Sequence, residues 1–254
     1  MLSKINNSIL ILSLSVFLLI FSSIKVFADE NVSASEETEA DVEEILVTAN
    51  RTEQSISDVS QAVQALSGDD LQDLQITDFE QMIDLIPGAV QNSSISQGSN
   101  VYSIRGVASA ETDGDATIGY YLDNFAFSLP GRPYAPVTDI YDTERVEVLR
   151  GPSGTLYGLG SLGGTIKVIT KDPVIGEFEG SFKATLADID DGDSSHTGDL
   201  MLNIPLSENA ALRGVLSIKD IGGWAEIIPS NQTNGNPYDG ITGRLKLLVE
   251  PSED

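Results

Sequence analysis

The feature that most constrains the fold of this chain is a strict alternation of apolar and polar residues along its last third. The alternation occupies four stretches between residues 178 and 250. In the first stretch Phe178 and Phe182 share one face of an extended strand, whereas Glu179 and Lys183 share the other. Strands of about ten residues with one apolar and one charged face are what a β-barrel in a membrane requires. A soluble β-sandwich also alternates, so the connecting loops must decide between the two folds.

The connections between these stretches differ in length. Residues 207–209 form a short turn, whereas residues 188–195 and 229–240 form long polar loops. Short turns at one end and long loops at the other are typical of outer-membrane barrels. We therefore predict the first strands of an antiparallel transmembrane β-barrel over residues 174–254. About four strands cannot close a barrel, and an open edge leaves amide groups unpaired in lipid, so we expect this barrel to be incomplete and the chain to be the N-terminal piece of a larger protein.

The chain opens with the layout of a secretory signal. A lysine, Lys4, precedes an apolar run from Ile9 to Phe21, and small residues lead up to Ala28. The alternative is a transmembrane anchor, but a spanning helix needs about 20 apolar residues, more than this run contains. We expect a cleaved signal peptide over residues 1–28 and, because the next segment is acidic and poor in apolar residues, a flexible leader over residues 29–43.

Composition excludes several classes of function. A formal net charge of −25 repels nucleic acids, and the absence of cysteine removes disulfides, thiolate zinc sites and cysteine nucleophiles. The single histidine, His196, is expected in the long acidic loop that begins with residues 188–193, and no catalytic triad or metal-ligand cluster is legible. That loop could hold calcium, but it lacks EF-hand spacing, and a solvated loop is the simpler interpretation. We expect no enzymatic activity, no cofactor, no bound metal and no nucleic-acid partner.

A β-prone segment, residues 44–49, follows the leader and is called the box segment below. A strand without a partner in its own chain can pair with a strand of another protein through main-chain hydrogen bonds. The alternative is that it is the first strand of the next domain. Its sequence resembles the TonB box of TonB-dependent outer-membrane receptors, which we place in residues 44–51. The resemblance implies that the periplasmic protein TonB binds here, through Glu44, Ile45, Leu46, Val47, Thr48 and Ala49.

The next stretch, residues 52–173, predicts a small mixed α/β domain. Ser67 and Thr77 each begin an [ST]-x-x-[DE] box that marks a helix N-terminus, and Pro87-Gly88 ends the second helix. Short strands separated by turns rich in glycine, proline and aspartate follow over residues 101–105, 118–122, 145–149 and 165–170.

Ordered motifs in this domain resemble the plug domain of TonB-dependent receptors. They are Leu85-Ile86-Pro87-Gly88, Ser103-Ile104-Arg105-Gly106, Gly119 to Asp123, Glu144 to Pro152, Gly154 to Gly158, and Gly163 to Pro173. The chain departs from the family at Leu159-Gly160, where many members carry an Arg-Asn pair. The resemblance implies an α+β plug inside a barrel in the bacterial outer membrane. It also implies TonB-driven uptake of a small-molecule ligand, usually a metal chelate such as an iron–siderophore complex.

The resemblance also implies roles for charged residues of the plug-like motifs. In the family, arginines and glutamates of these motifs hold the plug inside its barrel. The matching positions here are Arg105, Arg145, Glu147 and Arg150. The alternative for each is an ordinary solvated pair, which contributes little to stability.

The polar residues of the apical plug loops are the candidates for ligand binding. They are Asp113, Asp115, Arg132 and Tyr134, although loop solvation explains them as well. A rival function is a soluble periplasmic plug-like binding protein whose residues 177–254 pair with a second chain. Strand faces that are wholly apolar are costly in water without a partner, so solubility that depends on detergent would favour the barrel.

Overall fold

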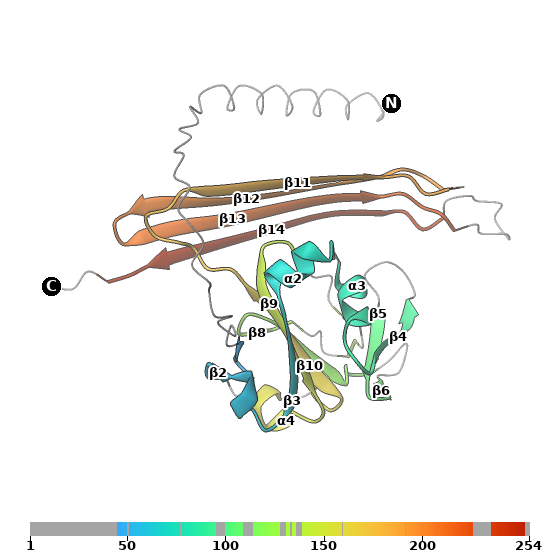
Figure 1. The fold of residues 1–254 in the computed structure, drawn as a ribbon. Coiled ribbons are helices and arrows are strands. Elements are labelled where there is room, and N and C mark those ends of the chain that lie inside the picture. The colour runs from blue at the N-terminus through green and yellow to red at the C-terminus, as the bar shows by residue number, and fades with distance from the viewer. Residues whose placement is uncertain are drawn as a thin grey trace, which may run out of the picture. The chain divides into compact units, whose positions relative to one another are not determined.

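The computed structural model describes most of the chain after the leader. The described residues are 45–251 without 50, 77, 95–99, 109–113, 128–130, 133, 136–138, 159, 191 and 226–234. The predicted signal peptide, the predicted leader and Glu44 therefore lie outside the described residues, as does the ligand candidate Asp113. The described chain consists of an α/β domain followed by four antiparallel strands, as the sequence predicts (Figure 1).

A five-stranded mixed sheet forms the centre of the α/β domain. Its strands, in spatial order, are β3 (Ala62–Ser67), β9 (Thr143–Arg150), β10 (Gly164–Thr170), β7 (Ile118–Leu122) and β8 (Phe125–Ala126). Strand β10 runs antiparallel to β9 and parallel to β7, so the centre of the sheet joins segments far apart in the sequence. Val146, Val148, Ile166 and Val168 are buried in its core.

Two short helices follow β3, namely α2 (Gly68–Asp73) and α3 (Phe79–Asp84). The Ser67 hydroxyl accepts a hydrogen bond from the Asp70 amide at 3.0 Å, and the Asp70 carboxylate accepts one from the Ser67 amide, so the predicted capping box is present. The second predicted cap, Thr77, lies outside the described residues, and the side chain of Asp78 caps α3. Within the described part of the chain, no helix is long and apolar enough to cross a membrane.

A three-stranded sheet packs beside α3. Its strands are β4 (Ala89–Ser94), β5 (Asn100–Ile104) and β6 (Val107–Ala108). Phe79, Met82 and Ile83 of α3 are buried with Tyr102 of β5 in the main core cluster, where the rings of Phe79 and Tyr102 lie 5.6 Å apart. The predicted apolar helix face is therefore a packing face.

The remaining elements of the α/β domain are short. They are β1 (Leu46–Val47), β2 (Gln54–Ser55), the 3-10 helix η2 (Ile56–Asp58) and α4 (Gly154–Tyr157). Strand β1 pairs antiparallel with β2, and Val47, Ala49, Leu149 and Tyr157 form a second, smaller core cluster.

The four alternating stretches form one antiparallel sheet in sequence order. Its strands are β11 (Glu179–Ala187), β12 (Ser195–Ser207), β13 (Ala210–Ile221) and β14 (Tyr238–Val249). The apolar face is exposed, since Leu186 is 78% and Ile241 77% accessible, whereas polar Asn203 and Arg213 on the other face are buried. This is the reverse of a soluble sheet and is the arrangement of a barrel wall. His196 lies in β12 and not in the acidic loop where we expected it, because β12 begins at Ser195.

Candidate functional site

The box segment is docked in the α/β domain. Its strand β1 pairs with β2, and the Ile45 carbonyl accepts a hydrogen bond from the Ile56 amide at 3.0 Å. The side chains of Val47 and Ala49 are completely buried, although Ile45 and Leu46 are about half exposed. The expectation that this segment has no partner in its own chain is therefore wrong for this structure, and the alternative, a first strand of the following domain, describes it better.

Polar side chains hold the box segment at Thr48. The carboxylate of Glu147 accepts hydrogen bonds from the Thr48 amide at 2.8 Å and from the Thr48 hydroxyl at 3.0 Å. The ammonium group of Lys167 donates to the same hydroxyl at 2.5 Å. The Tyr157 hydroxyl lies 3.0 Å from the carbonyls of both Thr48 and Ala49 and shares its one proton between them. The Thr48 amide therefore binds a side chain of the domain, and the Thr48 carbonyl accepts from the Tyr157 hydroxyl and from the Arg51 amide at 2.9 Å, so neither group pairs with a neighbouring strand.

The charges around Thr48 are buried and mutually compensated. Glu147 is completely buried and pairs with Arg145, whose Nε lies 2.8 Å from its carboxylate. Burial lowers the pKa of Lys167, and the negative charge of Glu147 opposes that effect. Burial, together with Glu147, raises the pKa of Tyr157 to about 12, while the guanidinium of Arg51, 5.4 Å from the centre of the Tyr157 ring, acts in the opposite direction. The raised pKa therefore keeps Tyr157 a hydrogen-bond donor at alkaline pH values at which an ordinary tyrosine, with a pKa of 10.0, loses its proton.

The residues predicted to hold the plug in its barrel lie within the α/β domain. Arg145 and Glu147 belong to the cluster around Thr48. The guanidinium of Arg105 donates to the Arg150 carbonyl at 3.4 Å, and that of Arg150 donates to the Pro87 carbonyl at 3.4 Å. These contacts join segments of the domain to one another, and binding of these residues to a barrel wall stays a prediction.

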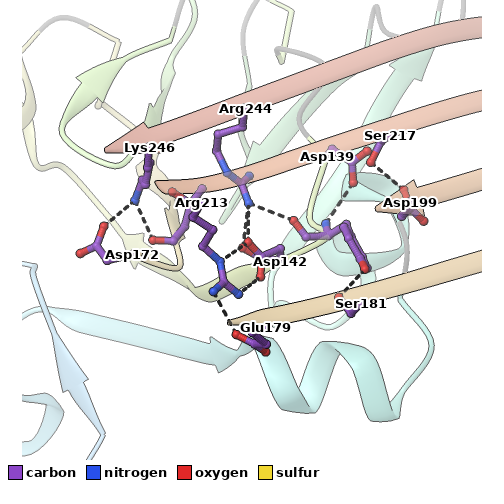
Figure 2. Close-up of polar contacts among 12 residues, drawn as sticks. Asp139, Asp142, Asp172, Glu179, Ser181, Asp199, Arg213, Ser217, Arg244 and Lys246 are labelled. Carbon is purple, nitrogen blue, oxygen red and sulfur yellow. Dashed lines mark hydrogen bonds and ion pairs between the residues drawn. The ribbon is translucent and has the colours of Figure 1, made fainter. Parts of the chain in front are cut away.

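Other residues join the α/β domain to the four-stranded sheet. Asp142 precedes β9 and binds Arg213 of β13 through two contacts, Nη2 to Oδ1 at 2.5 Å and Nε to Oδ2 at 2.8 Å (Figure 2). The guanidinium of Arg244 on β14 donates to the Asp142 carbonyl at 2.8 Å. The side chains of Arg213 and Asp142 are 3% and 5% exposed, so this is a buried, bidentate ion pair.

A second anchor lies at the end of β10. The ammonium group of Lys246 on β14 lies 2.9 Å from both the Thr170 carbonyl and the Asp172 carboxylate, and 3.4 Å from Asp123 (Figure 2 shows its contact with Asp172). Asp123 in turn accepts a hydrogen bond from the Thr170 amide at 2.8 Å. Because these partners include the turn after β7 and the end of β10, the anchor holds the central sheet to the polar face of the four-stranded sheet.

A buried asparagine fixes the segment that links the domain to β11. The side-chain amide of Asn203 accepts from the Val174 amide at 3.0 Å and donates to the carbonyls of Val174 and Glu177, at 2.9 and 2.8 Å. No sequence motif marks Asn203 or Asp142 as special, because their partners are distant in the chain.

The structure shows one contact that joins the two apical loops on which the candidate ligand-binding residues lie. The carboxylate of Asp115 accepts a hydrogen bond from the Gly131 amide at 2.9 Å, which joins the two apical loops. Arg132 is exposed and Tyr134 is half-buried, while Asp113 lies outside the described residues. Ligand binding by these residues stays a prediction. Among the described residues, no group of three or more histidines, aspartates and glutamates is placed to hold a metal ion.

Three comparisons place the chain among known proteins. The TonB-dependent Receptor Plug Domain matches residues 55–165. The pesticin receptor of Yersinia enterocolitica is 27% identical over 228 residues, which cover 88% of this chain and 32% of the receptor. The metal-pseudopaline receptor CntO of Pseudomonas aeruginosa is 31% identical over 181 residues, which cover 70% of this chain and 23% of CntO. The structure of the outer-membrane ferripyoverdine receptor of P. aeruginosa bound to ferripyoverdine matches with a TM-score of 0.56 and 25% identity, over 69% of this chain and 22% of that one.

The similarity to these proteins bears on the predicted fold class, the predicted location and the predicted family of the chain. The chain spans about a third of the length of the first curated relatives it matches. The predicted fold class, an α+β plug followed by the start of an antiparallel barrel, is confirmed. TonB-dependent receptors are outer-membrane transporters, which confirms the predicted location and the prediction that the chain is not an enzyme. The chain belongs to the TonB-dependent receptor family, with its α/β domain as the plug domain and β11–β14 as strands of the barrel wall.

Proposed function

We propose that this chain is the N-terminal part of a receptor that takes up a scarce ligand, above all a ferric siderophore, by TonB-coupled transport. The observation that carries the proposal is the anchoring of the plug domain on the polar face of β13 and β14, through Asp142 and Lys246, while the apolar face of the same sheet is exposed. A plug held inside a lipid-facing wall has no use in a soluble protein, so this geometry disfavours the rival, a soluble periplasmic plug-like binding protein.

The proposed cargo follows the relatives that the chain matches. CntO is a metal-pseudopaline receptor, and the matched P. aeruginosa structure holds ferripyoverdine. Both cargoes are metal chelates, and the hydrogen bond between Asp115 and Gly131 brings two polar apical loops together where such a ligand would arrive. Uptake of radiolabelled ferripyoverdine and metal–pseudopaline, with cobalamin as the competing class, by cells that express the complete receptor tests this assignment. Accumulation of cobalamin alone would contradict it.

Energy coupling is proposed to act through residues 44–49, which TonB would bind as an added strand. The direct test is binding of a peptide of residues 41–52 to the C-terminal domain of TonB, measured by titration calorimetry. We expect binding that is abolished by Val47→Pro, because proline removes the amide proton that a strand pair needs. A peptide with Thr52→Ala, outside the box, is the matched control and should bind like the native peptide. No binding of the native peptide would remove the coupling claim.

A further inference from the structure

We propose that a groove on the apolar face of the four-stranded sheet binds one acyl chain of a zwitterionic phospholipid. The groove has a volume of about 450 Å³ and crosses strands β12, β13 and β14. Its walls are aliphatic side chains such as Leu202, Leu216 and Leu245, and its floor includes Gly214 and Gly243, so it is called the glycine groove below. The inference goes beyond the proposed transport function, because it concerns the face of the sheet away from the plug domain.

The register of β13 and β14 explains the shape of the glycine groove. Gly214 pairs with Leu245, and Gly243 pairs with Leu216, so each glycine lies opposite a leucine of the neighbouring strand. Two missing side chains between two leucines leave a hollow in the apolar surface. Arg244, which follows Gly243, directs its guanidinium to the plug domain on the other face of the sheet. The groove is therefore apolar along its walls and its floor.

Nothing within the sheet requires glycine at these two positions. Neither has a positive φ, and the pairing of β13 with β14 continues without a bulge past both (Figure 1 shows the two strands as continuous). A Cβ added at Gly214 would lie 3.5 Å from a methyl carbon of Leu245, and one added at Gly243 would lie 4.0 Å from the Val215 carbonyl oxygen. Side chains would therefore fit. Glycine inside a strand without a bulge or a tight bend marks a place that another molecule approaches closely.

The depth of the glycine groove selects a hydrocarbon chain as its occupant. The same face of β13 carries Leu212, Gly214, Leu216 and Ile218, and it becomes charged at Asp220. Six residues separate Gly214 from Asp220, which corresponds to about 20 Å along the strand. A polar ligand would lose its hydration at this depth without gaining hydrogen bonds. An acyl chain has no such cost and gains apolar contacts with the walls.

The charges of the strands select the class of lipid. Within the four described strands, every lysine and arginine lies on the face that contacts the plug domain. They are Lys183, Arg213, Lys219, Arg244 and Lys246. The apolar face instead ends at the exposed pair Asp220 and Asp239, and exposed Glu208 and Glu250 lie near the short turn. These carboxylates repel an anionic lipid and attract the ammonium group of phosphatidylethanolamine.

Native mass spectrometry can measure the occupancy of the glycine groove. The receptor is extracted from outer membranes in a mild detergent and titrated with phosphatidylethanolamine. We expect the native protein to retain one molecule. The double variant Gly214→Leu/Gly243→Leu fills the groove and should bind about tenfold more weakly or worse, because losing contact with two methylene groups of the acyl chain already corresponds to a factor of this size.

The matched control is Gly198→Leu. Gly198 lies on the same face but does not line the glycine groove, and a Cβ there would meet nothing within 4 Å. This variant should bind phosphatidylethanolamine like the native protein. Equal affinity of all three proteins, or an equal loss in both variants, would overturn the proposal. Preferential retention of lipopolysaccharide in competition would also overturn it, as would a native dimer that the double variant converts to a monomer, since a second copy would then occupy the groove.

Thermal unfolding in detergent without phospholipid tests whether the strands themselves need the glycines. Gly214→Ala and Gly243→Ala should keep or raise the Tm, because alanine reduces the conformational entropy of the unfolded chain and fits the space. A lowered Tm in both would mean that the glycines serve the strands, and the proposal would fail. Added phosphatidylethanolamine should raise the Tm of the native protein more than that of the double leucine variant. If the double variant does not fold, Gly243→Leu alone decides, because its position is the more open of the two.

Discussion

At the scale of single residues, buried tyrosines tie the stability of the plug domain to pH. Burial is the main cause that raises the pKa of Tyr157 to about 12, and it also raises the pKa of Tyr102, Tyr120 and Tyr141. A raised pKa means that the folded chain keeps a phenol proton that the unfolded chain releases near pH 10.0. The stability from these groups is therefore fully present below pH 10 and is lost as pH rises.

Alkaline pH is accordingly expected to unfold the plug domain. Lys167 acts in the opposite direction, because its lowered pKa makes the unfolded chain bind more protons below its usual value of 10.5. The net loss should therefore become clear above about pH 10.5. Urea unfolding of the detergent-solubilised chain from pH 8 to 12 tests this, and Tyr157→Phe should show a shallower loss than the native chain. An identical pH profile for the two proteins would contradict the role of Tyr157.

At the scale of elements, the sequence predicts those strands and helix caps that depend on residues close to one another in the chain. The strand predicted over residues 118–122 is β7, and the one over 165–170 is β10 with one residue added. The capping box at Ser67 is present because all its groups lie within one helical turn. Strand β3 was not predicted, since its short segment becomes a strand through pairing with β9, which is about 80 residues away and outside any local window.

The contacts of the candidate site also divide into those that the local sequence predicts and those that depend on residues far apart in the chain. The box segment is recognisable by its β-prone sequence, but its docking depends on Glu147 and Tyr157, about 100 residues later in the chain. Asp142 belongs to a segment that its sequence marks only as a turn, and Arg213 belongs to the polar face of a strand. Alternation predicts the face of Arg213 but not its partner, because the partner is set by the packing of two domains.

The pair between Asp142 and Arg213 is expected to contribute to the anchoring of the plug domain far more than a surface pair does. Asp142 has a φ of +56°, a conformation that asparagine tolerates, so Asp142→Asn removes the charge without backbone strain. We expect the free energy of unfolding to fall by about 2 kcal/mol, because buried Arg213 loses its bidentate partner and keeps only Glu179, 3.1 Å away and 55% exposed, as a counter-charge. The control is Asp172→Asn, whose side chain is 76% exposed beside Lys246 and whose loss should stay within about 1 kcal/mol. Urea unfolding in detergent measures both, and equal small losses would show that the buried pair anchors nothing.

At the scale of the whole molecule, the four-stranded sheet has two different faces, one that contacts the plug domain and one that is suited to lipid. The polar face carries the anchors to the plug domain, whereas Leu186, Ile241 and Leu245 on the other face are all more than 70% exposed. Exposed apolar area on this scale is a site of association in water. The polarity of the sheet therefore requires an apolar environment and is not explained by packing within the described chain.

Removal of detergent is expected to aggregate the purified chain through this apolar face. Leu245→Lys places a charge on the exposed face of β14 and should reduce aggregation, because it interrupts the apolar surface. Thr242→Lys adds the same charge to the same strand on the opposite face, and it should not reduce aggregation. Light scattering during dialysis out of detergent compares the three proteins at equal concentration. If the native chain stays monomeric without detergent, or if both lysine variants behave alike, the exposed face is not a lipid-facing surface, and a soluble plug-like protein becomes the better account of the fold.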